Sequence, residues 1–198
     1  MIVSTGMATL EEIQEAVDAA KAAGCKELAL LKCTSSYPAL PEEMNLRTIA
    51  DLTARFQAPV GLSDHTLGST IPTAAVALGA CIVEKHFTLS RKSAGPDSAF
   101  SLEPDEFKNM VETIRVTEKA LGKVNYSISP NENKSRQFRR SLFVVEDVKA
   151  GERFTEKNVR SIRPGNGLHT RHLKEVLGRK AACDIERGAP LDWSRVAK

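Results

Sequence analysis

The feature that most constrains the fold is the alternation of strand-like and helix-like segments over the first 122 residues. Short apolar runs typical of strands occur at residues 2–4, 27–33, 59–63 and 81–87, and the run at 27–33 has few polar breaks, as in a strand buried on both faces. Each run precedes an amphipathic or alanine-rich segment, at residues 9–24, 45–56, 70–79 and 104–122. Because parallel strands need a crossover that a helix can supply, this order predicts an α/β domain with a parallel sheet.

The pattern changes after residue 122. Residues 123–138 are rich in Ser, Asn and Lys and are interpreted as a linker. Residues 139–198 contain short apolar runs separated by turn signals, including the Pro-Gly-Asn-Gly sequence at 164–167. The sequence therefore predicts an α/β domain over 1–122, a linker over 123–138 and a small, mostly-β domain over 139–198.

Composition excludes several classes of function. The chain has 198 residues with 28 Lys and Arg against 25 Asp and Glu, and 5% aromatics, so we expect no nucleic-acid partner. No apolar run approaches the roughly 20 residues of a membrane span, and no signal peptide is evident, so we expect no membrane partner. The cysteines are scattered without a CxxC pair, which indicates reduced thiols in a cytoplasmic protein.

Polar residues gather directly after the predicted strands. The stretches are "STGM" from residue 4, "KCTSSYP" from residue 32, "GLSDHT" from residue 61 and "EKHF" from residue 84. In parallel α/β folds the chemistry lies where strands end and loops begin, so we expect these stretches to form the functional rim.

Two histidines on this rim are candidate metal ligands. His65 and His86 each end a predicted strand. Consecutive parallel strands are usually neighbours and lie about 4.8 Å apart, so both imidazoles can meet on one divalent ion. Two protein ligands leave positions open for water and substrate. The alternative is a local hydrogen bond for each histidine, and spacing alone does not decide between the two.

The strand period of two assigns faces to the residues beside the histidines. Glu84 points the same way as His86, where it can orient a ligand or a metal-bound water. Lys85 points outward or toward a helix. Asp64 points away from His65 and is interpreted as an ion-pair or helix-cap residue, with its role left open.

Further polar residues are candidate substrate contacts. Ser4, Ser35 and Ser63 belong to three different strand ends, where hydroxyls and loop amides can hold an anion such as phosphate. The alternative for each serine is a turn or a helix cap. Asp97 either binds a sugar hydroxyl or caps a turn, and Arg163 either reaches a substrate or is a surface charge.

Seven motifs together resemble the sialic acid synthase family of bacterial nonulosonate synthases. In chain order they are "STGM", "KCTSSYPA", "LSDHTLG", "EKHFTL", "GPDSAFSLEP", "RRSLFVVEDVKAGE" and "IRPGNG", and they cover essentially the whole chain. "CTSSYPA" and "GPDSAFSLEP" are more similar to the pseudaminic acid branch than to the N-acetylneuraminate branch, in which Asn is usual where Ser35 stands. The N-acetylneuraminate and legionaminic acid branches are the alternatives.

The resemblance implies a fold and a reaction. The family has a TIM (β/α)₈ barrel followed by a small, mostly-β antifreeze-like domain of the β-clip type, also called a SAF domain. This chain would supply the C-terminal four β/α units of the barrel and the SAF domain. The family condenses phosphoenolpyruvate with an N-acetylated amino-sugar aldehyde and releases phosphate. Half a barrel leaves two sheet edges unpaired, so we expect the isolated chain to be inactive or nearly so. A non-catalytic carbohydrate-binding remnant and a synthase acting on another aldehyde are the alternatives.

The resemblance also implies roles for individual residues. His65 and His86 would hold a divalent metal, commonly manganese, with magnesium or cobalt as alternatives. The metal would polarise the sugar aldehyde, and Glu84 would help orient the water that captures the oxocarbenium-like centre.

The remaining matches concern substrate and partner. Five residues match positions that contact phosphoenolpyruvate or the sugar, namely Ser4, Ser35, Ser63, Tyr37 and Asp97. Arg163 matches the arginine that the SAF domain inserts into the active site of the partner subunit, which implies a head-to-tail homodimer.

Overall fold

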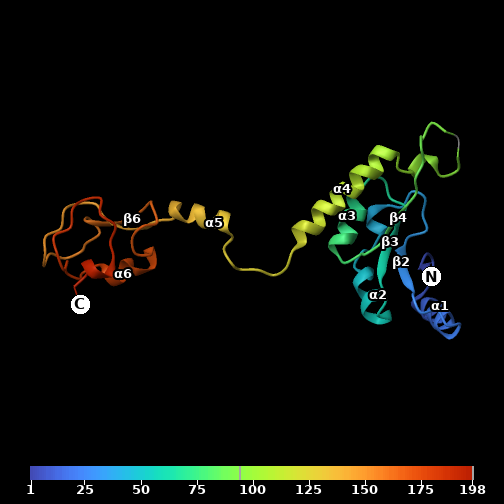
Figure 1. Cartoon of the computed structure of the whole chain (residues 1–198), viewed down its shortest axis with the longest axis horizontal. Helices are drawn as coiled ribbons and strands as arrows, with labels where there is room; N and C mark the ends of the chain where they lie inside the picture. Colours follow the sequence, from blue (N-terminus) through green and yellow to red (C-terminus); the bar gives the residue numbers. More distant parts are fainter. Residues whose placement is uncertain (94, 198) are drawn as a thin grey trace. The chain divides into compact units, whose positions relative to one another are not determined.

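The computed structural model describes residues 1–93 and 95–197, which form two compact units, Met1–Val124 and Asn125–Lys198. The first unit alternates strands and helices along the chain (Figure 1). Its strands are β1 (Ile2–Ser4), β2 (Ala29–Cys33), β3 (Val60–Asp64) and β4 (Val83–Lys85). Its α-helices are α1 (Leu10–Ala22), α2 (Thr48–Phe56), α3 (Thr70–Ala77) and α4 (Pro104–Leu121), with 3₁₀ turns η1 (Pro41–Glu43) and η2 (Ser98–Phe100).

The four strands form one parallel sheet in the order β1-β2-β3-β4. Each strand therefore pairs with its neighbour in the sequence, and β1 and β4 lie at the edges of this sheet. The predicted parallel β/α architecture is confirmed. All four strands point the same way, so their carboxyl ends share one edge of the sheet.

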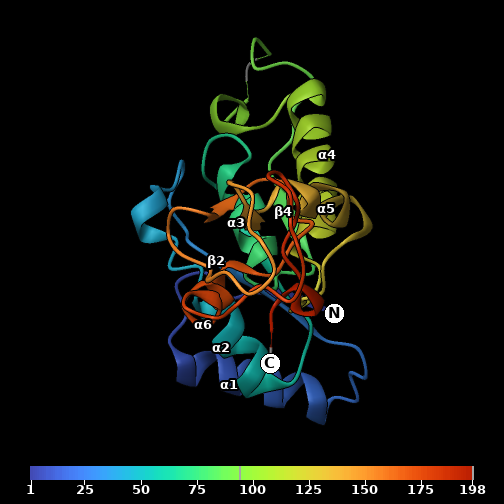
Figure 2. The same cartoon turned by 90° about the vertical axis from the view of Figure 1, so that its left-hand side faces the viewer.

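The helices cover one face of the sheet and build the core of this unit. Leu30 and Leu62 point to this face and are fully buried against Ile49 and Leu52 of α2 and Val17 of α1. Helices α1 and α2, at the lower edge of Figure 2, both contribute to this core. A smaller cluster joins α4 to β4 and α3, through Leu102, Met110, Ile114, Val76, Val83 and Phe107. Alternation along the strands leaves residues such as Ser63 on the opposite face.

The first helix begins where its sequence predicts. The Thr9 hydroxyl accepts from the Glu12 N–H at 3.3 Å, and the Thr9 N–H donates to the Glu12 carboxylate at 2.7 Å. This capping box satisfies two backbone groups that a helix start leaves without partners. It ends the loop after β1, which belongs to the functional rim.

The second unit begins with a short helix that the sequence did not predict. Residues 123–138, interpreted as a linker, contain α5 (Pro130–Ser135) and the 3₁₀ turn η3 (Arg136–Phe138). Ser129 and Glu132 form a capping box in front of α5, and Pro130 is its first residue. The residues of α5 are polar, so the sequence has no apolar periodicity there that would indicate a helix.

The rest of the second unit has few regular strands. β5 (Ser141–Val144) and β6 (Val159–Ile162) pair antiparallel, and isolated bridges such as Val148 with Ile185 extend the pairing. Helix α6 (Leu173–Val176) and the 3₁₀ turns η4 (Thr170–His172) and η5 (Trp193–Arg195) complete it. Its core contains the fully buried side chains Leu142, Val144, Phe154, Val176 and Leu191. In neither described range is any helix both long and apolar enough to span a membrane.

Candidate functional site

The predicted rim residues of β3 and β4 come together at the carboxyl ends of these strands. His65 directly follows β3 and His86 directly follows β4, and their ring centroids are 5.2 Å apart. A cavity of about 270 Å³ is lined by Ser63, Asp64, His65, Glu84, Lys85 and His86. The structure thus brings the two candidate metal ligands side by side.

The ring of His65 is held in one orientation. Its Nδ1 atom lies 2.8 Å from the carbonyl oxygen of Thr34, and the residue is 6% exposed. A carbonyl oxygen only accepts hydrogen bonds, so Nδ1 must carry the proton and Nε2 keeps its lone pair. Metal-binding histidines are commonly oriented by such a bond from the second ring nitrogen. His65 therefore has the tautomer that a metal ligand needs.

Lys32 anchors the segment whose Thr34 carbonyl orients His65. The Lys32 ammonium donates to the Thr34 hydroxyl at 2.6 Å and to the Cys33 carbonyl at 3.0 Å. Burial lowers the pKa of Lys32 below its usual value, because removal from water disfavours the charged form. These two bonds fix the end of β2 and hence the carbonyl that orients His65.

His86 lies beside a carboxylate and an aromatic ring. Its Nδ1 atom is 3.6 Å from Oδ2 of Asp97, which is too long for a good hydrogen bond but close enough for electrostatic attraction. The Phe100 ring packs against His86 with centroids 4.9 Å apart. Asp97, predicted to contact the sugar, therefore stands next to the second histidine, with its own side chain about half exposed.

Tyr37 completes an aromatic cluster around the two histidines. Its ring centroid is 4.2 Å from that of His65, 6.0 Å from that of His86 and 5.6 Å from that of Phe100. Tyr37 is 55% exposed, whereas Phe100 is 8% exposed. Sequence reasoning did not identify Phe100, and its only signal is an apolar residue at the end of a polar loop. The cluster limits how far either imidazole can turn.

On the face that carries the histidines, Ser63 and Glu84 are joined. They are paired by strand register, and the Ser63 hydroxyl donates to the Glu84 carboxylate at 2.7 Å. Ser63 is buried and Glu84 is exposed. The anion contact at Ser63 stays a prediction, and its hydroxyl proton is used by Glu84 in this structure.

On the helix face, Asp64 and Lys85 form a buried ion pair. The Lys85 ammonium donates to Asp64 Oδ2 at 2.5 Å, and the side chains are 1% and 0% exposed for Lys85 and Asp64. Lys85 also donates to the Thr66 carbonyl, and Asp64 accepts from the Thr66 N–H at 3.0 Å and hydroxyl at 3.1 Å. Of the two interpretations of Asp64, the ion pair is the one that the structure has.

The other predicted substrate contacts occupy neighbouring strand ends or the second unit. Ser4 is the exposed last residue of β1, and Ser35 lies two residues after β2. The Ser35 hydroxyl oxygen is 3.2 Å from the position that a Cβ on Gly6 would take, so Gly6 gives it room beside the β1 loop. Arg163 is exposed and directly follows β6 of the second unit.

The donor set suits a metal that keeps open positions. Over residues 1–93 and 95–197, no group of three or more His, Cys, Asp or Glu side chains is placed to hold an ion. Two neighbouring imidazoles, of which His65 has its Nε2 lone pair available, fit a divalent metal whose other ligands are water or substrate. The residues present therefore fit an exchangeable catalytic metal better than a closed structural one.

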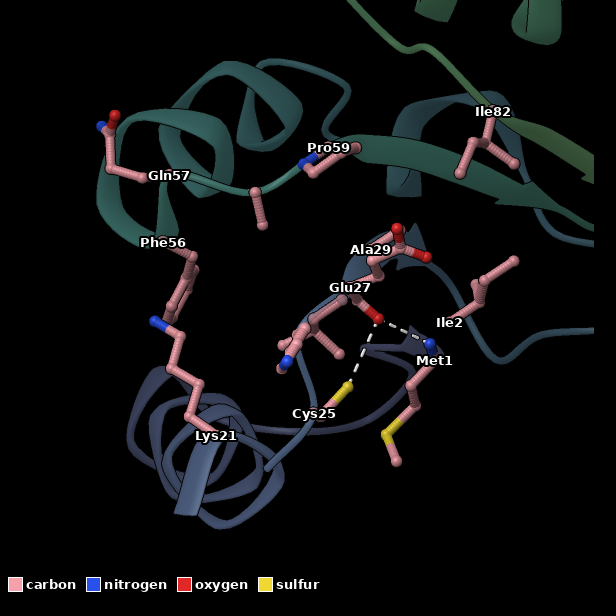
Figure 3. Close-up of a pocket in the computed structure, with 13 residues that line it drawn as sticks. Met1, Ile2, Lys21, Cys25, Glu27, Ala29, Phe56, Gln57, Pro59 and Ile82 are labelled. Carbon is pink, nitrogen blue, oxygen red and sulfur yellow. Dashed lines mark hydrogen bonds between the residues drawn. The ribbon is translucent and has the colours of Figure 1, made fainter. Parts of the chain in front are cut away.

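A second cavity, of about 720 Å³, lies at the opposite ends of the strands (Figure 3). Met1, Ile2, Ala29 and Pro59 line it near the starts of β1, β2 and β3. The terminal amino group of Met1 and the Cys25 thiol both donate to the Glu27 carbonyl, at 2.7 and 3.3 Å. Because parallel α/β enzymes carry their chemistry at the carboxyl ends, the histidine cavity is the candidate site.

Comparisons with known proteins agree with this architecture. The NeuB family matches residues 1–126, and the SAF domain matches residues 139–197. Pseudaminic acid synthase of Campylobacter jejuni is 47% identical over 193 residues, covering 98% of this chain and 56% of that protein. Pseudaminic acid synthase of Helicobacter pylori is 43% identical, covering 96% of this chain and 56% of that protein. N,N'-diacetyllegionaminic acid synthase of Legionella pneumophila is 38% identical, covering 99% and 56%.

Solved structures give the same result. The crystal structure of the spore coat polysaccharide biosynthesis protein SpsE of Bacillus subtilis matches with a TM-score of 0.59 and 36% identity, over 100% of this chain and 61% of that one. The N-acetylneuraminic acid synthetase of Leptospira borgpetersenii matches with a TM-score of 0.62 and 37% identity, over 68% and 47%. The chain spans little more than half the length of the curated relatives named above. The expected resemblance and fold class are confirmed, and the chain belongs to the NeuB family, with a SAF domain after its β/α units.

Proposed function

We propose that this chain carries the metal-binding part of a nonulosonic acid synthase. The reaction condenses phosphoenolpyruvate with an N-acetylated amino-sugar aldehyde and releases inorganic phosphate. The observation that carries the proposal is the pair of rings of His65 and His86, 5.2 Å apart at neighbouring strand ends in a NeuB-family chain. Pseudaminic acid synthesis is the proposed branch, supported by the two curated relatives of that name and by the "CTSSYPA" and "GPDSAFSLEP" motifs.

A divalent metal, manganese in the first instance, would be held by the two histidines. The Thr34 carbonyl orients His65 so that its Nε2 lone pair is available, and Asp97 lies beside Nδ1 of His86. When bound, such a metal acts as a Lewis acid on the aldehyde carbonyl. In the proposed reaction the aldehyde carbonyl carbon is the electrophile, and the methylene carbon of phosphoenolpyruvate is the nucleophile.

Glu84 is proposed to serve the water that enters the product. The new bond joins the methylene carbon of phosphoenolpyruvate to the aldehyde carbon and leaves positive charge on the adjacent carbon, which bears the phosphate. The aldehyde oxygen takes up a proton, and water adds to the charged carbon while losing one. Glu84 is exposed toward the cavity, and its carboxylate is held by the Ser63 hydroxyl at 2.7 Å, so it can orient this water and accept its proton. Cleavage of the carbon–oxygen bond then releases phosphate.

Hydroxyl groups around the cavity would hold the two substrates. Ser4 and Ser35 are exposed donors at the ends of β1 and β2, suited to the anionic groups of phosphoenolpyruvate. Tyr37 and Asp97 flank the histidines and are suited to the hydroxyl and acetamido groups of the sugar. In the proposed head-to-tail homodimer, the exposed Arg163 of one subunit serves the active site of the other. The phosphorylated substrate of the proposed reaction and the free cysteines of the chain are consistent with a cytoplasmic enzyme.

A complementation assay tests the function. The chain is co-expressed with the segment of the Campylobacter jejuni enzyme that it does not cover, and phosphate release is measured with phosphoenolpyruvate, Mn²⁺ and a panel of N-acetylated amino-sugar aldehydes. We expect turnover in the pair, little or none in either part alone, and loss of turnover with His65→Ala. Sugar binding by the purified pair without phosphate release, and without any effect of metal, would instead support a carbohydrate-binding module.

A further inference from the structure

We propose that the Asp64–Lys85 ion pair is a positioning device that sets the spacing of His65 and His86. The inference rests on the proposed metal site and adds to it two residues on the helix-covered face of the sheet. Both residues line the histidine cavity, but the Lys85 and Asp64 side chains are only 1% and 0% exposed, so neither side chain is open to a metal or a substrate there.

The pair acts directly on strand register. Asp64 and Lys85 are register partners at the last paired position of β3 and β4. Each is followed immediately by one of the histidines, so the step beyond this pair places His65 opposite His86. On the other face, Ser63 and Glu84 join the preceding register position. The strand ends are therefore linked on both faces just below the two rings.

Thr66 extends the device past His65. Asp64 accepts from the Thr66 N–H and hydroxyl, and Lys85 donates to the Thr66 carbonyl. The backbone on both sides of His65 is thus tied to one ammonium–carboxylate pair. The chain leaving β3 cannot turn without breaking at least one of these buried hydrogen bonds.

The choice of charges favours a role in register rather than in stability alone. A buried ion pair costs much desolvation, and a well-packed apolar pair of similar volume often stabilises a fold equally well. An apolar contact has no directional bonds, whereas a shift of one position would leave Lys85 or Asp64 buried without its partner and so adds a further penalty against the wrong register. Because one step also exchanges the two faces of a strand, the ion pair excludes the register in which a histidine points into the helix layer.

The test compares three variants of the full chain: Lys85→Met, Asp64→Asn, and the double variant Asp64→Leu with Lys85→Met, which restores an apolar contact. Ile49→Val, a substitution in the buried core on α2, is the control for a loss of packing away from the strand ends. The first measurement, without metal, is the nuclear Overhauser contact between the His65 and His86 rings. The second is the Mn²⁺ dissociation constant.

We expect the ring contact in the wild-type chain and in Ile49→Val, and its loss or weakening in the ion-pair variants, including the double variant. Mn²⁺ affinity should fall roughly 10- to 100-fold in the ion-pair variants, as for other groups that orient metal ligands. A folded double variant with an unchanged ring contact and a dissociation constant within about twofold of wild type would overturn the inference. If the wild-type chain binds no Mn²⁺, the proposed metal site fails, and the ring contact still decides on the positioning role.

Discussion

The Nδ1 atom of His65 donates its hydrogen to the Thr34 carbonyl at 2.8 Å, which fixes the tautomer of a candidate metal ligand. We predict that neutral His65 is protonated at Nδ1 and unprotonated at Nε2. Long-range ¹H–¹⁵N correlation of the histidine rings above pH 7 measures this directly. A ring with its proton on Nε2 would show that the Thr34 bond does not form in solution, and the metal ligand would then need another arrangement.

The buried ion pair predicts a non-additive effect on stability. Lys85→Met or Asp64→Asn alone should destabilise the β3–β4 region by about 3 to 5 kcal/mol, because each leaves a buried polar group without its partner. The double apolar replacement should cost clearly less than the sum. Hydrogen exchange of the β3 and β4 amides provides the local free energies of opening. Additive losses would mean that the two side chains do not stabilise each other.

At Gly61, in β3, the sheet leaves no room for a side chain. A Cβ at this position would lie 2.4 Å from the Ile82 carbonyl oxygen and 2.7 Å from the Leu31 side chain. We expect Gly61→Ala to destabilise the first unit by about 1 to 3 kcal/mol, since the sheet must shift to admit the methyl group. Adding Leu31→Ala should not rescue it, because the closer contact is with backbone. A neutral Gly61→Ala in urea unfolding would contradict this packing.

The loop that carries Asp97 and Phe100 is tied to α4 through Arg91 and Glu106. Arg91 donates to both carboxylate oxygens of Glu106, one at 2.8 Å, and the Glu103 N–H donates to the same carboxylate at 2.9 Å. These bonds lower the pKa of Glu106 to about 2. A lowered pKa in the folded state stabilises it above the ordinary value near 4.5, and this contribution disappears as the pH falls toward 2.

We therefore predict that Arg91→Gln raises the pKa of Glu106 and reduces the acid dependence of stability between about pH 4.5 and 2. The carboxylate signal of Glu106, followed by NMR during acid titration, measures the shift. The contribution to stability should be small, because the pair is largely exposed and screened by solvent. An unchanged Glu106 titration in the variant would show that Arg91 does not hold it.

In the first unit, local patterns were enough to predict the order of strands and helices. The apolar run ending at Cys33 and the capping box at Thr9 and Glu12 each have a direct physical cause in neighbouring residues. Helix α5 was missed because its six residues are polar and packing supplies no periodic signal. The available signs were its capping box, at Ser129 and Glu132, and Pro130 at its first position.

The site was predictable only in part. Strand parity indicated that Glu84 shares a face with His86 and that Asp64 points away from His65, and both follow from the period of two. Parity does not say which residues of neighbouring strands lie opposite each other, so the Asp64–Lys85 bond could be identified only once the strand register was known. The Thr34 carbonyl and the Phe100 ring reach the histidines from other segments, and such tertiary contacts leave no local pattern.

The most direct test of the account is Mn²⁺ binding by the full chain, measured by electron paramagnetic resonance, for the wild type and for His65→Ala, His86→Ala and His169→Ala. His169 lies in the second unit and provides the matched control. We predict one exchangeable site in the wild type and in His169→Ala, and at least about 100-fold weaker binding in the other two, since loss of a ligand should exceed loss of a group that orients one. Equal binding by all four chains, or no binding by the wild type, would contradict the assignment of His65 and His86 as the metal site.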